Sequence, residues 1–151
     1  MTIQLDDTFE EVLGNTFEGM AFSFVERSDD LDFDWSRADL CWASIDLIEP
    51  AQGRLYLVVP TEEAIALAES VVGDQGLQPD DALAVLGEVA NTVGGLWLIE
   101  LDEGNRGTRL GLPKTGIGTL PEDAGAQVAL FDFDEGLIGA LLVVGPTHDD
   151  L

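Results

Sequence analysis

The stretch of residues 79–100 constrains the fold more than any other, because its apolar residues recur at the spacing of an α-helix. The stripe predicted to be buried consists of Leu83, Leu86, Ala90, Val93 and Trp97. The opposite side carries, at i, i+3, i+4 and i+7, the residues Glu88, Asn91, Thr92 and Gly95. We therefore expect one carboxylate and one carboxamide, a turn apart, on an exposed ridge with small residues beside them. Such a ridge could be inserted into a cleft of another protein.

The segment LGEVANTVGG, which contains Glu88 and Asn91, resembles the second helix motif of the CheC/CheX/FliY family. Members of this family are phosphatases that act on the phosphorylated response regulator of chemotaxis. Their motif places a polar residue, Asp or Ser, four positions before the Glu, and a Pro some twenty residues after the Asn. Pro113 lies one residue short of the usual spacing, and Ala84 stands where the polar residue is expected. The resemblance extends loosely over most of the chain and is closest to CheX-like members.

The predicted fold is α+β, with residues 1–151 forming a single CheX-like domain. We expect a mainly antiparallel sheet of about six strands, built from hairpins, with helices packed on one face. The resemblance also implies a pseudo-two-fold repeat of helix-plus-hairpin units. Strands are predicted at 21–26, 41–49, 54–59, around Leu110, and at 127–133 and 137–144. Helices are predicted from a cap at Thr8, from a cap at Thr61, and over 79–100.

Three local predictions concern which side chains are buried. In the first helix the apolar face consists of Phe9, Val12, Leu13, Phe17 and Met20. In the strand that follows, Phe22 and Phe24 are expected to point inward. In the second helix the buried side is predicted to contain Ile65, Ala68, Val71 and Val72. Gly73 is expected to end that helix, and the tail from Thr147 is expected to fray.

The chain contains an internal echo of the motif. Residues 12–19 and 85–92 align without gaps, so that Glu88 and Asn91 correspond to Asn15 and Glu18, with the two chemistries exchanged. Gly14 and Gly87 occupy the same place within a helix, where glycine costs about 1 kcal/mol relative to alanine. A close contact with a neighbouring element would explain both glycines, and coincidence in a short window is the alternative. Under the resemblance, only the second unit keeps the active pair.

Composition restricts the partners of the chain. Thirty acidic residues face six basic ones, so the formal net charge is −24. Binding to nucleic acid or to an anionic membrane needs clustered basic residues, and neither partner is expected. Residues 1–7 carry no basic region followed by an apolar one, and no segment is expected to approach the length of a membrane span, so we expect a soluble cytoplasmic protein. The excess of Asp over Glu fits adaptation to a salty cytoplasm, or a general habit of an acidic proteome.

The resemblance implies a substrate, which is an aspartyl phosphate on a CheY-type receiver domain. Asn91 would position a water for in-line attack, because a carboxamide both accepts and donates hydrogen bonds. Glu88 would bind the active-site Lys of the receiver, since an exposed glutamate is a weak base at neutral pH. No cofactor is needed on this chain, and Mg²⁺ would be supplied by the receiver. The residues expected to line the docking face are Ala84, Thr92 and Gly95, and the resemblance makes a homodimer plausible.

Three alternatives remain open from the sequence. Glu88 and Asn91 are residue types that also occur on any solvated helix face. The chain could instead be a non-catalytic receiver-binding or flagellar-switch-like adaptor, or a phosphatase for a receiver outside chemotaxis. Other candidate sites have less support: Cys41 is expected to be a buried inert thiol, and His148 is the only histidine. The acidic group Asp132, Asp134 and Glu135 is expected to form a hairpin turn rather than a calcium loop.

Overall fold

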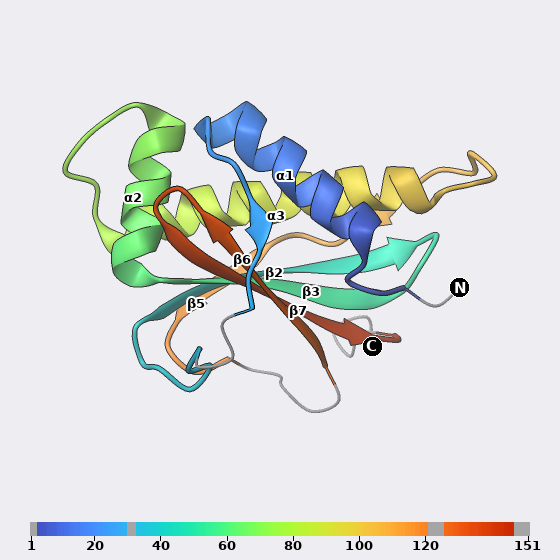
Figure 1. The fold of residues 1–151 in the computed structure, drawn as a ribbon. Coiled ribbons are helices and arrows are strands. Elements are labelled where there is room, and N and C mark those ends of the chain that lie inside the picture. Colours follow the sequence, from blue (N-terminus) through green and yellow to red (C-terminus); the bar gives the residue numbers. More distant parts are fainter. Residues whose placement is uncertain (1–2, 30–32, 121–125, 147–151) are drawn as a thin grey trace.

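The computed structural model describes residues 3–29, 33–120 and 126–146 (Figure 1). Within these ranges, the helices are α1 (Asp7–Ala21), α2 (Thr61–Val72) and α3 (Pro79–Leu101). The strands are β1 (Glu26–Arg27), β2 (Leu40–Glu49), β3 (Gly53–Pro60), β4 (Arg109–Leu110), β5 (Lys114–Ile117), β6 (Gln127–Phe133) and β7 (Gly136–Val144). The predicted α+β class is confirmed. Residues 147–151, which include His148 and for which fraying is predicted, lie outside the described residues.

All described strands belong to one antiparallel sheet in the order β1-β6-β7-β3-β2-β4, with β5 also paired to β2. The two predicted hairpins, β2–β3 and β6–β7, are confirmed, and β3 and β7 pair with each other at the centre. The expected count of about six strands becomes seven, because the segment after α3 forms two short strands along β2 rather than one.

The sheet order shows the predicted pseudo-two-fold repeat. In the first half α1 is followed by one short strand and then a hairpin, and in the second half α3 is followed by two short strands and then a hairpin. The short strand β1 pairs with β6 of the second hairpin, and β5 pairs with β2 of the first, so each unit completes the edge of the other. Among the described residues, helix α2 has no counterpart in the second half.

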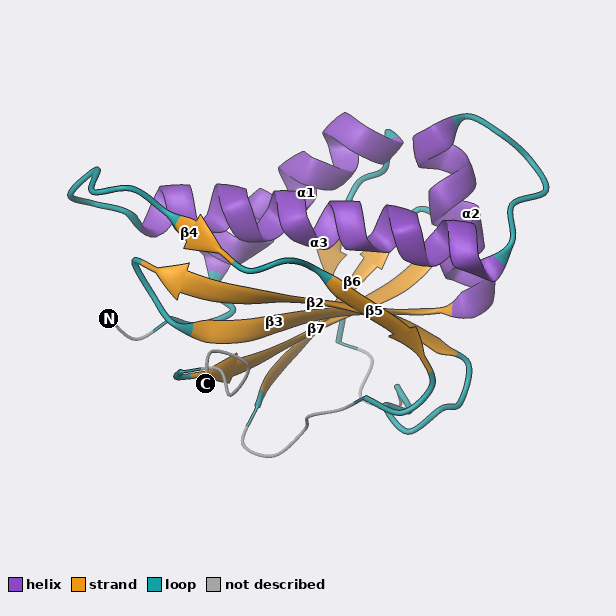
Figure 2. Cartoon of the chain, turned by 180° about the vertical axis from the view of Figure 1, so that it is seen from behind, coloured by secondary structure: helices purple, strands orange, loops and turns teal. Residues whose placement is uncertain are grey.

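The three helices cover one face of the sheet (Figures 1 and 2). Alternate residues of β2 and β3 point toward them and are fully buried, as the strand periodicity requires. The other face carries a smaller apolar cluster, centred on Tyr56 and Leu141, against which Trp35 and Trp42 pack. Helices therefore cover one face of the sheet, whereas aromatic side chains from the loop before β2 and from β2 itself pack on the other.

The start and end of α1 differ from prediction. The N-cap is Asp6 rather than Thr8: the Asp6 carboxylate accepts from the backbone N–H of Thr8 at 3.1 Å and of Phe9 at 3.3 Å. The helix continues through Ala21, and Phe22 then adopts a left-handed conformation with φ of 54°. The predicted strand at 21–26 is therefore wrong, and only Glu26 and Arg27 pair with β6.

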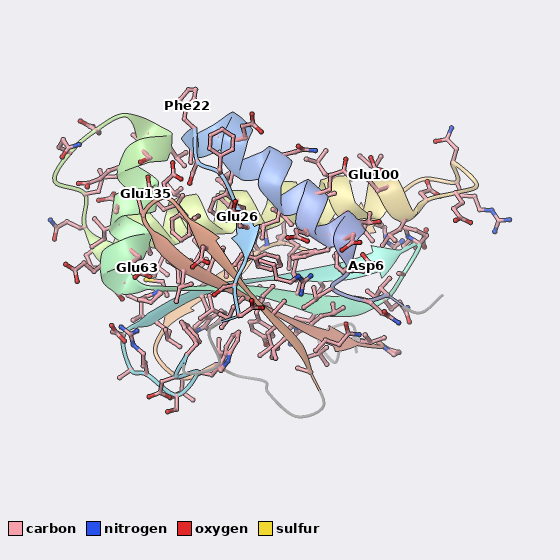
Figure 3. The ribbon with its side chains drawn as sticks, in the orientation of Figure 1. Asp6, Phe22, Glu26, Glu63, Glu100 and Glu135 are labelled. Atoms are coloured by element: carbon pink, nitrogen blue, oxygen red, sulfur yellow. The ribbon has the colours of Figure 1, made fainter. Side chains whose placement is uncertain are left out.

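The predicted inward positions of Phe22 and Phe24 are also wrong. Their side chains are 81% and 69% exposed, and Figure 3 shows Phe22 pointing away from the end of α1. The alternation of these two aromatic residues is typical of a strand and led to the wrong prediction. Because the chain reverses at Phe22 instead of entering the sheet, neither ring meets the core.

Helix α2 is shifted relative to the prediction. Pro60 occupies the N-cap position, and the Thr61 hydroxyl donates to the Asp39 carbonyl at 2.6 Å instead of capping. The buried residues are Ala64, Leu67 and Ala68. Ile65 and Val71 are only partly buried, and Val72 is 55% exposed. Gly73 ends the helix in the left-handed conformation, as expected.

Helix α3 corrects the expectation about membrane spans. The helix has 23 residues, and an 18-residue window within it has a mean hydropathy of 1.5, so by length and composition it could cross a membrane. Half of that window is buried inside the structure, where it packs on the sheet and on the other helices. We therefore interpret α3 as the central helix of the core.

Candidate functional site

The candidate site lies on α3, whose beginning is fixed by local contacts. Pro79 takes the first helical turn, where its missing N–H has no partner to lose. The Asp81 carboxylate accepts from the backbone N–H of Gln78 at 2.8 Å. The observed helix, Pro79–Leu101, agrees with the predicted range 79–100. The side chains predicted to face solvent can therefore be compared directly with the structure.

The predicted buried stripe of α3 is confirmed. Leu86, Ala90, Val93 and Trp97 are each at most 1% exposed, and Leu83 is partly buried against the same core. The Trp97 ring packs edge-on against Phe9 of α1, with the ring centroids 4.9 Å apart. This packing prevents α3 from rotating about its axis, and it therefore fixes the opposite face as well.

Two glycines bring α3 close to the sheet. A Cβ at Gly94 would lie 3.1 Å from the Ile45 side chain of β2, and a Cβ at Gly87 would lie 3.3 Å from the Thr115 methyl of β5. The second contact supports the close-approach explanation for Gly87. For Gly14 that explanation is wrong, because nothing lies within 4 Å of a Cβ placed there.

The opposite face of α3 presents the candidate pair to solvent. Ala84, Glu88 and Asn91 are exposed, and Thr92 and Gly95 are partly exposed. Positions 84, 88, 91 and 95 share one helix face by their spacing. Within the described ranges, the side chains of Glu88 and Asn91 take part in no hydrogen bond or ion pair. A carboxylate and a carboxamide on a rigid helix are thus free to bind another molecule.

Glu88 and Asn91 lie on an exposed helix face, and none of the described cavities is lined by either residue. A cavity of about 500 Å³ lies elsewhere, beside Arg27, Phe33, Trp35 and Val128, and includes none of the candidate residues. An exposed helix face cannot enclose a small substrate, whereas it can enter the concave site of a second protein. The geometry therefore favours a macromolecular partner.

The segment between β4 and β5 runs beside α3 (Figure 2). The Leu110 side chain lies 3.5–3.6 Å from Cβ positions at Gly94 and Gly95, and Pro113 lies 3.9 Å from the one at Gly87. Between these two anchor points Leu112 is 86% exposed. This exposure is not apparent from the sequence, because Leu112 lies two residues after Leu110 and would be expected to point to the same side.

The corresponding motif on α1 is exposed too. Asn15 and Glu18 both face solvent, and within the described residues neither has a side-chain partner. Since α1 and α3 are the two helices related by the pseudo-two-fold repeat, the molecule carries one Glu/Asn pair on each, in opposite orders. Substitutions of Asn15 and Glu18 are therefore a matched control for substitutions of Asn91 and Glu88.

Other candidate residues have structural roles. Cys41 is fully buried, and burial raises the pKa of its thiol, which leaves little thiolate for nucleophilic chemistry. Asp134 and Glu135 form the β6–β7 turn as predicted, and the Ser70 hydroxyl donates to Glu135 at 2.7 Å. The carboxylate of Glu63 on α2, which Figure 3 labels, accepts from the backbone N–H of Leu137 at 3.3 Å. In the part of the chain that the structure describes, no three His, Cys, Asp or Glu side chains are placed to hold a metal ion.

No protein-family model and no curated protein matches this sequence. Solved structures do match. Chemotaxis protein CheX from Vibrio vulnificus is 15% identical with a TM-score of 0.73, over 95% of this chain and 100% of that one. A CheX from Borrelia burgdorferi, solved with CheY, BeF3 and Mg, is 16% identical with a TM-score of 0.67, over 93% and 99%. FliY from Thermotoga maritima is 17% identical with a TM-score of 0.64, over 96% and 92%.

These matches define the class of fold. It is an α+β fold in which a long central helix and its partner helix lie over an antiparallel sheet of two interlocked units. The chain has the fold of the CheX, CheC-like and FliY chemotaxis proteins, and the predicted resemblance is confirmed at that level.

Proposed function

We propose that this chain is a CheX-like phosphatase that hydrolyses the aspartyl phosphate of a CheY-type receiver domain and so ends a chemotaxis signal. The observation that carries the proposal is the exposed face of α3, where Glu88 and Asn91 have no side-chain partner among the described residues and the helix is held by its buried side. The likeness to a CheX solved with CheY supports a receiver as the partner. A soluble cytoplasmic protein made of one such domain over residues 1–151 fits this role.

Asn91 positions the attacking water in this proposal. Its carboxamide oxygen accepts a hydrogen bond from the water, while its NH₂ group donates to a phosphoryl oxygen. The water oxygen attacks phosphorus as the bond from phosphorus to the aspartyl oxygen breaks. The products are inorganic phosphate and a free aspartate, and the water gives its protons to phosphate and solvent. An acyl phosphate is an activated substrate, so positioning is the main requirement.

Glu88 docks the receiver in this proposal. A carboxylate one turn before Asn91 can form a charge-assisted bond with the active-site lysine of the receiver, which sets the register of the two proteins. An exposed glutamate is a poor general base at neutral pH, and positioning of water needs none. The receiver supplies Mg²⁺ from its own acidic pocket, and this chain contributes side chains only.

Ala84, Thr92 and Gly95 complete the proposed docking face. Ala84 is exposed and carries only a methyl group one turn before Glu88, so a polar interaction at this position is lost while access to Glu88 is kept. Gly95 leaves the surface low one turn after Asn91. A receiver loop can therefore approach the pair from both ends of the ridge.

A receiver-binding adaptor without catalytic activity is the second candidate. Ala84 in place of the polar residue and the likeness to FliY favour it. The two candidates differ in turnover, because an adaptor binds the phosphorylated receiver and leaves the phosphate in place. A third variant, a phosphatase for a receiver outside chemotaxis, differs only in its substrate.

The test is loss of radiolabel from a phosphorylated receiver of the same organism, with and without this protein. Asn91→Ala should abolish the acceleration with binding retained, and Glu88→Ala should weaken both. Asn15→Ala and Glu18→Ala, which remove the same residue types from the exposed face of α1, should behave as wild type. Acceleration that survives Asn91→Ala would overturn the role of Asn91, and binding without acceleration would favour the adaptor. A panel of receivers distinguishes a wrong substrate from a wrong function.

A further inference from the structure

Leu112 lies beside the turn of α3 that carries Glu88 and Asn91. Its neighbours anchor it: Leu110 packs at the position of Gly94, and Pro113 packs at that of Gly87. Three extended residues span about 10 Å, and the seven helical residues from 94 to 87 span about 10.5 Å. The segment therefore runs antiparallel to α3 along its length, and Leu112 stands level with residues 89–90, next to the candidate pair.

The side chain of Leu112 has no role in the core. It is 86% exposed, the largest exposed fraction among the large apolar side chains described. Leu110 fills the space against α3, and a Cβ at Gly111 would face Asp46 on the opposite side. Because Leu112 is held in water between two packed residues and beside the polar pair, a protein that docks on this pair would also bury its side chain.

Ile99 extends the same surface. It lies eleven residues after Glu88, which returns it to the same helix face within about 20°, and it is 59% exposed. The ridge is therefore polar toward the start of α3 and apolar toward its end, with Leu112 beside it. Both apolar residues lie on the side of the molecule that the proposed docking uses.

The charge of the chain explains why docking needs apolar contacts. A net charge of −24 repels the acidic pocket that holds Mg²⁺ in a receiver, so long-range attraction contributes little to association. Burial of apolar area does not depend on the sign of charge. We propose that Leu112, together with Ile99, binds an apolar patch of the receiver beside its phosphorylated aspartate. This inference rests on the proposed phosphatase function.

The experiment measures the rate of receiver dephosphorylation at increasing concentrations of this protein, which separates the half-saturating concentration from the maximal rate. Leu112→Ser should raise the half-saturating concentration roughly tenfold to 100-fold, the effect of losing one buried leucine contact, with the maximal rate unchanged. Leu112→Met should keep most of the wild-type affinity for the receiver, because methionine is apolar and of similar volume. Val128→Ser is the matched control, since Val128 is 57% exposed on β6, away from the ridge.

The outcomes keep the two proposals apart. If Asn91→Ala lowers the maximal rate and Leu112→Ser has wild-type affinity, the role of Leu112 is refuted and the phosphatase function stands. If no variant and no receiver gives acceleration, the phosphatase function itself fails. An equal loss in Val128→Ser would indicate a general surface effect and would also refute a specific role for Leu112. If Leu112→Ser unfolds at the same temperature as the wild type, a folding defect is excluded as the cause of its weaker binding.

Discussion

The contact of α3 with the sheet at Gly94 can be tested by adding a single methyl group. Gly94→Ala gains about 1 kcal/mol of helix propensity. The new Cβ would lie 3.1 Å from the Ile45 methyl, with Leu110 and Leu47 at 3.5 and 3.6 Å. Carbon atoms pack at about 3.5–4.0 Å, and Ile45 is fully buried and cannot move into solvent. Overpacking of this kind costs about 1–3 kcal/mol, so the expected net change in unfolding free energy is between zero and a loss of about 2 kcal/mol.

The matched control is Gly14→Ala on α1, the position related to Gly87 by the internal echo. It gains the same propensity and meets nothing within 4 Å, so the unfolding free energy should rise by about 1 kcal/mol. Urea unfolding followed by tryptophan fluorescence measures both variants. The difference between them should be about 1–3 kcal/mol. Equal stabilisation by the two alanines would show that α3 does not lie on β2 as closely as described.

Two further predictions concern charge and the single thiol. Dephosphorylation of the receiver should accelerate as salt rises from about 0.05 to 0.5 M, because screening weakens repulsion between an acidic protein and an acidic pocket; stopped-flow rates that fall with salt would contradict this. Cys41 should react with a thiol reagent at pH 8 many times more slowly in the native protein than in urea, because burial raises the pKa of the thiol and blocks access; equal rates would refute it.

The sequence predicted best those elements whose pattern is long and whose ends carry strong signals. The bounds of α3 and of both hairpins agree with prediction to within a residue, because many apolar positions agree on one period. The exposed positions of Glu88 and Asn91 follow from the same register. A long stripe fixes its own opposite face, and the candidate pair could therefore be found without a structure.

The predictions from sequence are wrong where a short pattern is overruled by a contact that the pattern does not reveal. Phe22 and Phe24 alternate as a strand does, yet a helix that ends in the left-handed conformation turns them into solvent. Thr61 was expected to cap α2, but its hydroxyl binds Asp39, a residue 22 positions away. Strand β5 was missed because its pairing with β2 supplies the order that its four residues, Lys114–Ile117, do not show alone. The end of α1 is set by a local cap, in which the Phe22 N–H donates to the Phe17 carbonyl, whereas the Thr61 bond and the β5 pairing are contacts distant in sequence.

The exposed pair and the glycines of α3 are linked by the same packing. Gly87 immediately precedes Glu88, and the Thr115 methyl of β5 lies 3.3 Å from where a side chain at position 87 would begin. A side chain there would crowd the Thr115 methyl, so either Thr115 or α3 would have to shift, and the close approach of α3 to the segment that carries Leu112 would be loosened. The glycine is thus needed for the spacing between the polar pair and the apolar residue beside it. On α1 no strand approaches Gly14, and no exposed leucine on a packed segment lies beside Asn15 among the described residues. The repeat therefore reproduces the residue types on both helices, but the surroundings proposed for receiver docking are present only at α3.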